Sequence, residues 1–353
     1  MNMNALASSP INNRDNAVSV DDLVIHFHTR AGTVKAVDGV SFDIRPGETF
    51  GIIGESGSGK TTLGRALAGL LKATDGHIRY QGREPAALSK AEQRQIRRDY
   101  QIIFQDPHAA LNPRMTILQS VMEPMEILRD GDARQRQRVA KEALERVGLP
   151  AEIGKRYPHE LSGGQKQRVN IARTLTLKPR FIVCDEVVAA LDVSIRGSVL
   201  NLFADLQKEL GITYAFITHD ISVVSHVSDR VGVLYLGRLM EVGPAAAVTE
   251  KPIHPYTQAL LSAEPLPLPS DQRDQRRAIR LQGEIPSPLA PPSGCRFRTR
   301  CPAAQSRCAE QEPAWREVAP EHWVACHFAD SEGGPLDREQ SISFGRESAT
   351  ETV

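Results

Sequence analysis

Residues 54 to 61 form a glycine-rich loop that ends in a lysine and a threonine. An apolar run precedes the loop and a helix-like stretch follows it, so the loop should join a strand to a helix. Its backbone N–H groups can turn toward a triphosphate, while the lysine reaches the outer phosphates and the threonine hydroxyl binds Mg²⁺. A glycine turn without chemistry is the alternative, and the flanking pattern favours a P-loop. The predicted ATP-binding residues are Gly54, Glu55, Ser56, Gly57, Ser58, Gly59, Lys60, Thr61 and Thr62.

Two acidic residues, Asp185 and Glu186, follow the apolar run 181–184. Enzymes that hydrolyse nucleoside triphosphates need a carboxylate for Mg²⁺ at the end of a buried strand and, commonly, a group that orients the attacking water. Asp185 is the predicted Mg²⁺ ligand, and Glu186 is predicted to polarise the water. An acidic pair that simply ends a strand at the surface is the alternative, and the upstream P-loop disfavours it.

A second anion-binding pattern occurs at residues 161–165, where a serine and two glycines precede a predicted helix. Backbone N–H groups and the helix dipole would point the same way there, although an ordinary serine N-cap would leave the same pattern. One molecule does not need two grips for one nucleotide, whereas two molecules facing head to tail do. The residues expected to cap the partner's nucleotide are Ser162, Gly163, Gly164 and Gln165.

These motifs and their order resemble those of the ATP-binding subunits of ABC transporters. The resemblance implies that Gln105 is the glutamine that shares Mg²⁺ with Thr61 and Asp185 and contacts the membrane partner. It also implies that His219 steadies the γ-phosphate.

Two further roles follow from the same resemblance. Asp192 would belong to the surface that meets the second ATPase, and Phe27 is the candidate for stacking on adenine. One departure stands out, because Val187 and Ala190 replace the family's usual proline and serine. The sequence leaves open whether this slows hydrolysis.

The fold that must position these residues is predicted to be α/β. It combines a P-loop core, an antiparallel β edge and a helical insert, with a parallel sheet covered on both faces. Cys184 is expected to be a small core residue. The predicted strands are 18–27, 34–44, 48–54, 76–80, 100–104, 181–184, 213–217 and 231–236, and the predicted helices include 88–98, 194–210 and 221–227.

Four segments are expected along the chain. The ATPase domain covers 17–254, with a helical subdomain at about 112–178, and a loop-rich extension covers 255–330. Disordered tails are expected at 1–16 and 331–353 because these segments hold few large apolar residues.

Four cysteines lie in the extension: Cys295, Cys301, Cys308 and Cys326. Their spacing allows Zn²⁺, a [4Fe–4S] cluster or independent buried thiols. The extension, from His254 onward, is similar to that of dipeptide, oligopeptide and nickel importers. Because related ATPases carry a cluster at a pattern matched by residues 294–302, the resemblance favours iron–sulfur.

Charge and hydropathy restrict the partners. Forty-three basic residues balance forty-three acidic ones, so bulk charge does not favour nucleic acid. The N-terminus does not read as a secretion signal, and apolar runs are too short to span a membrane, which predicts a cytoplasmic location.

The resemblance implies a complete importer around this chain. A second, different ATPase subunit, two permeases and a solute-binding protein would be its partners, at the cytoplasmic face of the membrane, and it would power the uptake of peptides or a related solute. The alternative is a soluble ABC ATPase that acts on ribosomes or DNA.

Overall fold

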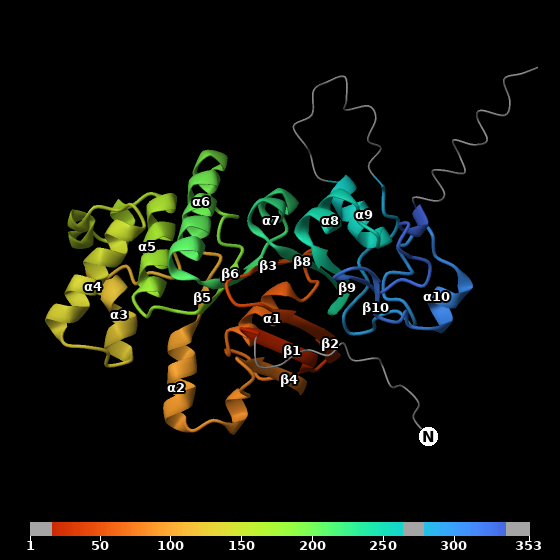
Figure 1. Cartoon of the computed structure of the whole chain (residues 1–353), viewed down its shortest axis with the longest axis horizontal. Helices are drawn as coiled ribbons and strands as arrows, with labels where there is room; N and C mark the ends of the chain where they lie inside the picture. Colours follow the sequence, from red (N-terminus) through yellow and green to blue (C-terminus); the bar gives the residue numbers. More distant parts are fainter. Residues whose placement is uncertain (1–15, 264–278, 337–353) are drawn as a thin grey trace, which may run out of the picture.

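The computed structural model describes residues 16–263 and 279–336 (Figure 1). Most of the predicted tails at 1–16 and 331–353, and the proline-rich linker around Pro265, lie outside the described residues. Residues 331–336 were expected to be disordered, but the structure packs them on the body of the protein. Leu336 is buried, and Gly334 packs on the Ile253 carbonyl.

Two sheets organise the described part of the chain. The larger has the order β10-β11-β9-β8-β3-β7-β6-β5, and the smaller has the order β2-β1-β4. β3, β5, β6, β7 and β8 run parallel, and the other neighbours pair antiparallel. The strands are β1 Val18–Thr29, β2 Gly32–Ile44, β3 Thr49–Ile53, β4 Asp75–Tyr80, β5 Tyr100–Ile103, β6 Phe181–Asp185, β7 Thr213–Ile217, β8 Arg230–Tyr235, β9 Arg238–Pro244, β10 Arg316–Ala319 and β11 His322–Val324.

The parallel strands are buried on both faces, which explains their continuous apolar sequences. Side chains of a strand alternate between faces. In β7, Tyr214 and Phe216 therefore pack with the helical side of the molecule, whereas Ala215 and Ile217 pack toward α1 and the small sheet. The helices are α1 Lys60–Leu67, α2 Lys90–Asp99, α3 Ile117–Ile127, α4 Ala133–Arg146, α5 Gly163–Leu175, α6 Val193–Leu210, α7 Ile221–Val227, α8 Ala245–Glu250, α9 Pro255–Ser262 and α10 Ser306–Glu310.

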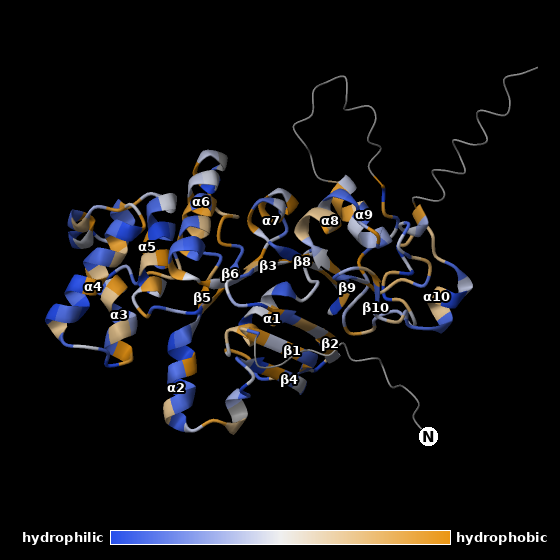
Figure 2. Cartoon of the chain, in the orientation of Figure 1, coloured by the Kyte–Doolittle hydropathy of each residue, from blue (hydrophilic) through white to orange (hydrophobic). Residues whose placement is uncertain are grey.

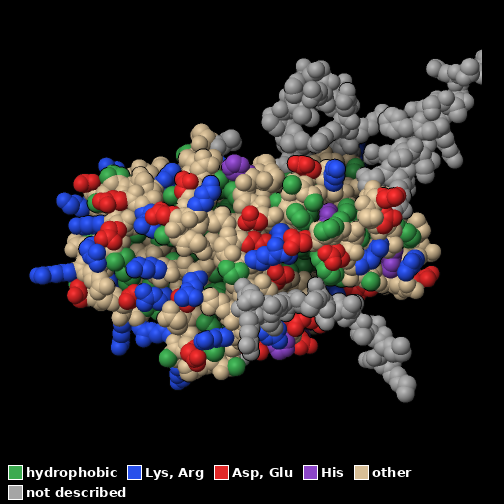
Figure 3. All heavy atoms as spheres, in the orientation of Figure 1, with side chains coloured by type: hydrophobic (Ala, Val, Ile, Leu, Met, Phe, Trp, Pro, Cys, Tyr) green, Lys and Arg blue, Asp and Glu red, His purple; other side chains and the backbone are tan. Residues whose placement is uncertain are grey.

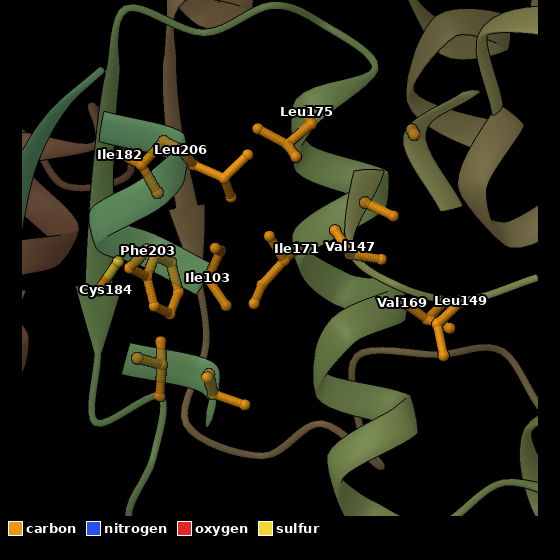
Figure 4. Packing of buried hydrophobic residues seen from close by; sticks show 14 of the residues in the cluster. Ile103, Val147, Leu149, Val169, Ile171, Leu175, Ile182, Cys184, Phe203 and Leu206 are labelled. Atoms are coloured by element: carbon orange, nitrogen blue, oxygen red, sulfur yellow. The ribbon is translucent and has the colours of Figure 1, made fainter. Parts of the chain in front are cut away.

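The helical insert predicted at 112–178 contains α3, α4 and α5 and shares one apolar cluster with β5, β6, β7 and α6. Figure 4 shows Ile171 of α5 and Phe203 of α6 on either side of Ile103 in this cluster. Cys184 is fully buried in the same cluster, as predicted for a core residue. The insert is therefore packed firmly against the sheet.

α2 differs from the other helices because every one of its residues is at least partly exposed. It extends away from the body of the molecule and is strongly hydrophilic (Figures 1 and 2). A capping box at Ser89 and Glu92 fixes its first turn. On the face shown in Figure 3, acidic and basic side chains are interspersed, in keeping with the balanced composition.

The C-terminal extension is more ordered than the sequence predicted. β11 pairs with β9, so the extension adds two strands to the central sheet instead of forming a separate loop-rich module. β9 itself was missed by the sequence analysis. The buried rings of Tyr235, Tyr256 and Phe297 join the extension to the ATPase domain in one apolar cluster.

Candidate ATP-binding site

The predicted P-loop lies between the end of β3 and the start of α1, which begins at Lys60. Two of its glycines are required by close approach of the neighbouring backbone. A Cβ on Gly54 would lie 2.1 Å from the Leu234 carbonyl oxygen, and one on Gly59 would lie 2.2 Å from that of Ala36. Both glycines also have positive φ, 153° and 106°. The loop is thus fixed between β2 and β8, while Ser56 and Gly57 at its tip are exposed.

The ammonium group of Lys60 folds back on the loop. It donates hydrogen bonds to the Gly54 carbonyl at 2.7 Å and to the Glu55 carbonyl at 2.9 Å. Burial lowers the pKa of Lys60, and the nearby carboxylates of Glu186, Asp185 and Glu55 oppose that shift. A buried cation that uses main-chain carbonyls can exchange these partners for phosphate oxygens, which carry full charge.

Thr61 and Asp185 meet at the predicted Mg²⁺ position, where the hydroxyl donates to the carboxylate at 3.4 Å. Asp185 is 5% exposed, and its pKa is raised by burial and by the neighbouring Glu186 carboxylate. Mg²⁺ prefers oxygen ligands and keeps several waters and substrate phosphates, so a hydroxyl and one carboxylate fit its needs.

Glu186 is the centre of the site. Its two carboxylate oxygens accept hydrogen bonds from Gln105 Nε2 at 2.7 Å and from His219 Nδ1 at 3.2 Å. The structure thus brings together residues from the ends of β5, β6 and β7. Glu186 also adopts the left-handed conformation, with φ 50°, a strained state that functional sites commonly hold.

The second glycine pattern lies outside this set of contacts. Ser162 is exposed and caps α5 by accepting a hydrogen bond from Gln165 N, so the N-cap alternative also describes it. Gly164 is buried, and a Cβ there would lie 2.7 Å from Ile195 Cγ2. Asp192 is exposed at the N-terminus of α6. The serine and the aspartate therefore face outward, where a second molecule could reach them.

Phe27, the candidate for adenine stacking, lies on β1 with 41% of its surface exposed. It pairs with Val34 of β2, two residues from Ala36, which contacts the P-loop. Its role as an adenine contact stays a prediction. The unusual Val187 is 1% exposed, so this side chain fills core space after Glu186; its effect on hydrolysis also stays a prediction.

The sequence analysis missed the residues that hold Glu55 of the P-loop. Glu55 N donates to the Tyr256 hydroxyl at 2.8 Å, and the Glu55 carboxylate forms a bidentate pair with Arg300 at 2.6 and 3.0 Å. Arg300 lies 245 positions away in sequence. The sequence shows a tyrosine at position 256 and several arginines between Cys295 and Cys301. Nothing in their spacing indicates that they contact Glu55.

The four cysteines of the extension are free thiols that line one small cavity together with His254 and Phe297. Burial and the neighbouring thiols raise the pKa of Cys295 to about 11 and that of Cys301 to about 12. Across 16–263 and 279–336, no group of three or more His, Cys, Asp or Glu side chains is placed to hold a metal ion. The cysteines thus share a cavity without forming a ready set of ligands.

A cavity of about 280 Å³ lies between β5 and the helical insert. Two apolar side chains at its edge are unusually open, Phe104 at 41% and Ile127 at 69% exposure. Arg97 supplies positive charge to its lining, whereas the charge of Arg173 is paired with Glu123 at 2.6 Å. Because Phe104 directly precedes Gln105, this groove is connected through one residue to the Glu186 centre.

Two findings bear on membrane association. Within the described ranges, the structure has no helix that is both long and apolar enough to cross a bilayer. The groove beside Gln105 leaves apolar side chains in contact with solvent, a feature that often marks a protein interface.

Comparisons with known proteins agree with the motif order. A family model described as ABC transporter matches residues 37–189, and one described as Oligopeptide/dipeptide transporter, C-terminal region, matches residues 240–308. The chain is 50% identical over 303 residues to the oligopeptide transport ATP-binding protein AppF of Bacillus subtilis (strain 168), covering 86% of this chain and 92% of AppF. It is 48% identical over 324 residues to the oligopeptide transport ATP-binding protein OppF of Escherichia coli (strain K12), covering 89% of this chain and 96% of OppF.

A solved structure resembles the central part of the chain. The ATP-binding cassette MJ0796, in a dimeric post-hydrolysis state bound to ADP and Pi, is 30% identical and has a TM-score of 0.58. The match covers 65% of this chain and 98% of that cassette. The sequence alternative of action on ribosomes or DNA finds no support among these relatives, whose names describe transport.

The raised pKa of Asp185 predicts that Asp185→Asn stabilises the ligand-free protein. A raised carboxyl pKa in the folded state means that stability falls as pH rises from the unfolded toward the folded pKa, because the charged form is disfavoured in the folded protein. Removing the charge should raise the melting temperature by about 1 to 3 °C, while stabilisation by ATP with Mg²⁺ should shrink. Thermal unfolding with and without the ligand measures both.

Asp220→Asn is the control with the opposite sign. Burial opposes ionisation of Asp220, but hydrogen bonds from Ser222 and Val223 N and the charge of Arg196 leave its pKa lowered. Its charge therefore stabilises the fold above the unfolded pKa, and its loss should lower the melting temperature at pH 7. Equal shifts of the two variants in one direction would contradict the electrostatic assignment.

Proposed function

The chain belongs to the ATP-binding subunits of ABC transporters, and we propose that it hydrolyses ATP to power the import of peptides through separate permease subunits. The observation that carries the proposal is the contact of Gln105 and His219 with Glu186, beside Lys60 of the P-loop. The relatives AppF and OppF are named as oligopeptide transport proteins, which supports peptides as the transported solute.

The nucleotide chemistry follows from positions of the side chains. Lys60 and the loop N–H groups hold the β- and γ-phosphates, and Thr61, Asp185 and Gln105 provide oxygens for Mg²⁺, which neutralises phosphate charge when bound. Glu186 accepts the proton of the attacking water. His219, which contacts Glu186 in the ligand-free site, would steady the charge that develops on the γ-phosphate.

A second ATPase subunit completes this site in the proposal. The exposed Ser162 at the start of α5, with Gly163, Gly164 and Gln165, would cap the γ-phosphate of the partner's ATP. Asp192 would lie in the same interface. The dimeric state of the MJ0796 cassette supports such pairing, and we propose that the partner is a different ATPase subunit.

The groove between β5 and the helical insert would receive a helix of a permease. An apolar segment fits Phe104 and Ile127, and an acidic residue of that segment would pair with Arg97. Because Gln105 follows Phe104 and bonds to Glu186, movement at the groove would alter the hydrolytic centre. We propose that the chain lies peripherally at the cytoplasmic face of the membrane, with a solute-binding protein on the other side.

The boundaries expected from the sequence remain part of the proposal. The ATPase domain would cover 17–254 and the importer-type extension 255–330. Phe27 would stack on the adenine. Cys295, Cys301, Cys308 and Cys326 would hold a [4Fe–4S] cluster, with Zn²⁺ as the alternative; their common cavity supports a shared ligand, although the thiols must move to bind it.

Changing Glu186 to Gln tests the hydrolytic role. The amide keeps the size and can still bond to Gln105, but it cannot accept a proton at neutral pH, so the rate of phosphate release should fall by about 100-fold or more. ATP affinity, measured by equilibrium binding of a fluorescent ATP analogue, should change little. Glu142→Gln, on the exposed face of α4, is the control. Persistent hydrolysis in Glu186→Gln would refute the assignment.

Changing Ile127 to Asp tests the permease surface. A carboxylate at this exposed position would lose its solvation when an apolar permease segment covers it, so the fraction of the chain that sediments with membranes should fall by about tenfold. ATP binding checks the fold of the variant. Leu210→Asp, at the exposed end of α6, is the matched control and should sediment like the wild type. Equal loss in both variants would contradict a specific surface.

Anaerobic purification of the full chain tests the cysteine proposal. A [4Fe–4S] cluster should give broad visible absorbance and about four iron atoms per chain, and both should be lost when Cys301 is changed to Ser. Cys184→Ser is the comparison, because this thiol is buried in the β6 core. Stoichiometric zinc would refute the cluster and support the Zn²⁺ alternative. Protein that contains neither iron nor zinc would refute a shared metal site.

A further inference from the structure

The C-terminal extension holds the phosphate loop at Glu55. Arg300 Nη1 and Nη2 donate to the two carboxylate oxygens of Glu55 at 2.6 and 3.0 Å. The main chain of the same residue is held too, because Glu55 N donates to the Tyr256 hydroxyl at 2.8 Å. Side chain and backbone of one loop residue are therefore fixed by two parts of the extension.

Both contacts are protected from water. The Arg300 side chain is 8% exposed and the Glu55 side chain 25% exposed, so the bidentate pair is screened less than a surface ion pair. The Arg300 guanidinium also lies 5.9 Å from the ring centre of Tyr235. Tyr256 is fully buried and packs against Tyr235 and Phe297. Packing with these rings fixes the positions of the Arg300 guanidinium and the Tyr256 hydroxyl.

The hydrogen bond from Lys60 to the Glu55 carbonyl is expected to break when ATP binds. Lys60 donates to the Glu55 and Gly54 carbonyls in the ligand-free loop. Once its ammonium group turns to the phosphates, the Glu55 carbonyl keeps a hydrogen bond from Ser58 N at 3.2 Å within the loop. Tyr256 and Arg300 are then the contacts that tie Glu55 to the extension. If these contacts were lost, the loop would have to become ordered when ATP binds, and the free-energy cost of that ordering would weaken binding.

We propose that Arg300 and Tyr256 are positioning residues for the phosphate loop, and that the C-terminal extension thereby sets the affinity of the ATPase for ATP. The inference rests on the proposed ATPase function. It gives the extension a direct task in nucleotide binding. Neither residue would touch the nucleotide, because both act through Glu55.

Arg300→Gln in the full-length chain is the first test. Loss of a bidentate, largely buried pair should weaken ATP binding by about 5- to 20-fold, whereas kcat at saturating ATP should stay within about twofold of wild type. Arg300→Lys should restore part of the affinity, since it keeps the charge without the fork. Arg298→Gln is the matched control, because Arg298 lies in the same segment and donates to Ser293 within the extension. It should bind ATP like the wild type.

Tyr256→Phe keeps the ring packing and removes the hydroxyl that accepts from Glu55 N, so it provides a second test should Arg300→Gln fold poorly. Its affinity for ATP should fall by a factor of about 3 to 10. In a Glu55→Gln background, Arg300→Gln should add less than about twofold, because the pair is already broken.

The outcomes separate this inference from the proposed function. Wild-type affinity in both Arg300→Gln and Tyr256→Phe would overturn the inference while leaving the ATPase intact. A fall in kcat with unchanged affinity would overturn it as well. A wild-type chain that fails to bind ATP with Mg²⁺ would instead overturn the proposed function itself.

Discussion

Parallel pairing in the central sheet is the constraint on which the site depends. Asp185 lies opposite Ile217, which in turn lies opposite Ile52. The chain leaves β3, β6 and β7 just beyond this row, so the P-loop, Glu186 and His219 emerge at one edge of the sheet. Neighbouring parallel strands that end in register bring their following residues together at such an edge. A shift of one residue in β7 would exchange the two buried faces of the strand and separate His219 from Glu186.

The same edge concentrates groups that the fold alone would avoid. Lys60 is buried with its pKa lowered, Asp185 is buried with its pKa raised, and Glu186 adopts a backbone conformation unusual for a residue with a side chain. Each feature opposes stability in the absence of a ligand. A bound polyphosphate with a divalent cation supplies opposite charges to both Lys60 and Asp185. The arrangement is therefore understandable as a site whose polar groups are satisfied by its ligand.

Much of the ATPase core could be predicted because its signals are local. The P-loop, the acidic pair after β6 and the apolar runs of the parallel strands each occupy a few consecutive residues, and the structure contains the strands where they were expected. The extension could not be predicted in this way. β11 is three residues long, too short for a hydropathy period, and its pairing with β9 depends on a buried contact between His322 and Glu241 at 2.7 Å. The ion pair between Arg300 and Glu55 joins residues far apart in the sequence. The spacing of residues along the chain does not predict such a pair.

The continuous sheet has a consequence for how the chain can be divided. β9 pairs with β8 on one side, and its outer edge is covered by β11. A fragment that ends after α9 would leave β9 with unpaired backbone groups and would expose the ring of Tyr256 where Phe297 now covers it. Open strand edges beside apolar surface promote self-association. Any attempt to study the nucleotide-binding half by itself would thus create an aggregation-prone surface that the intact polypeptide conceals.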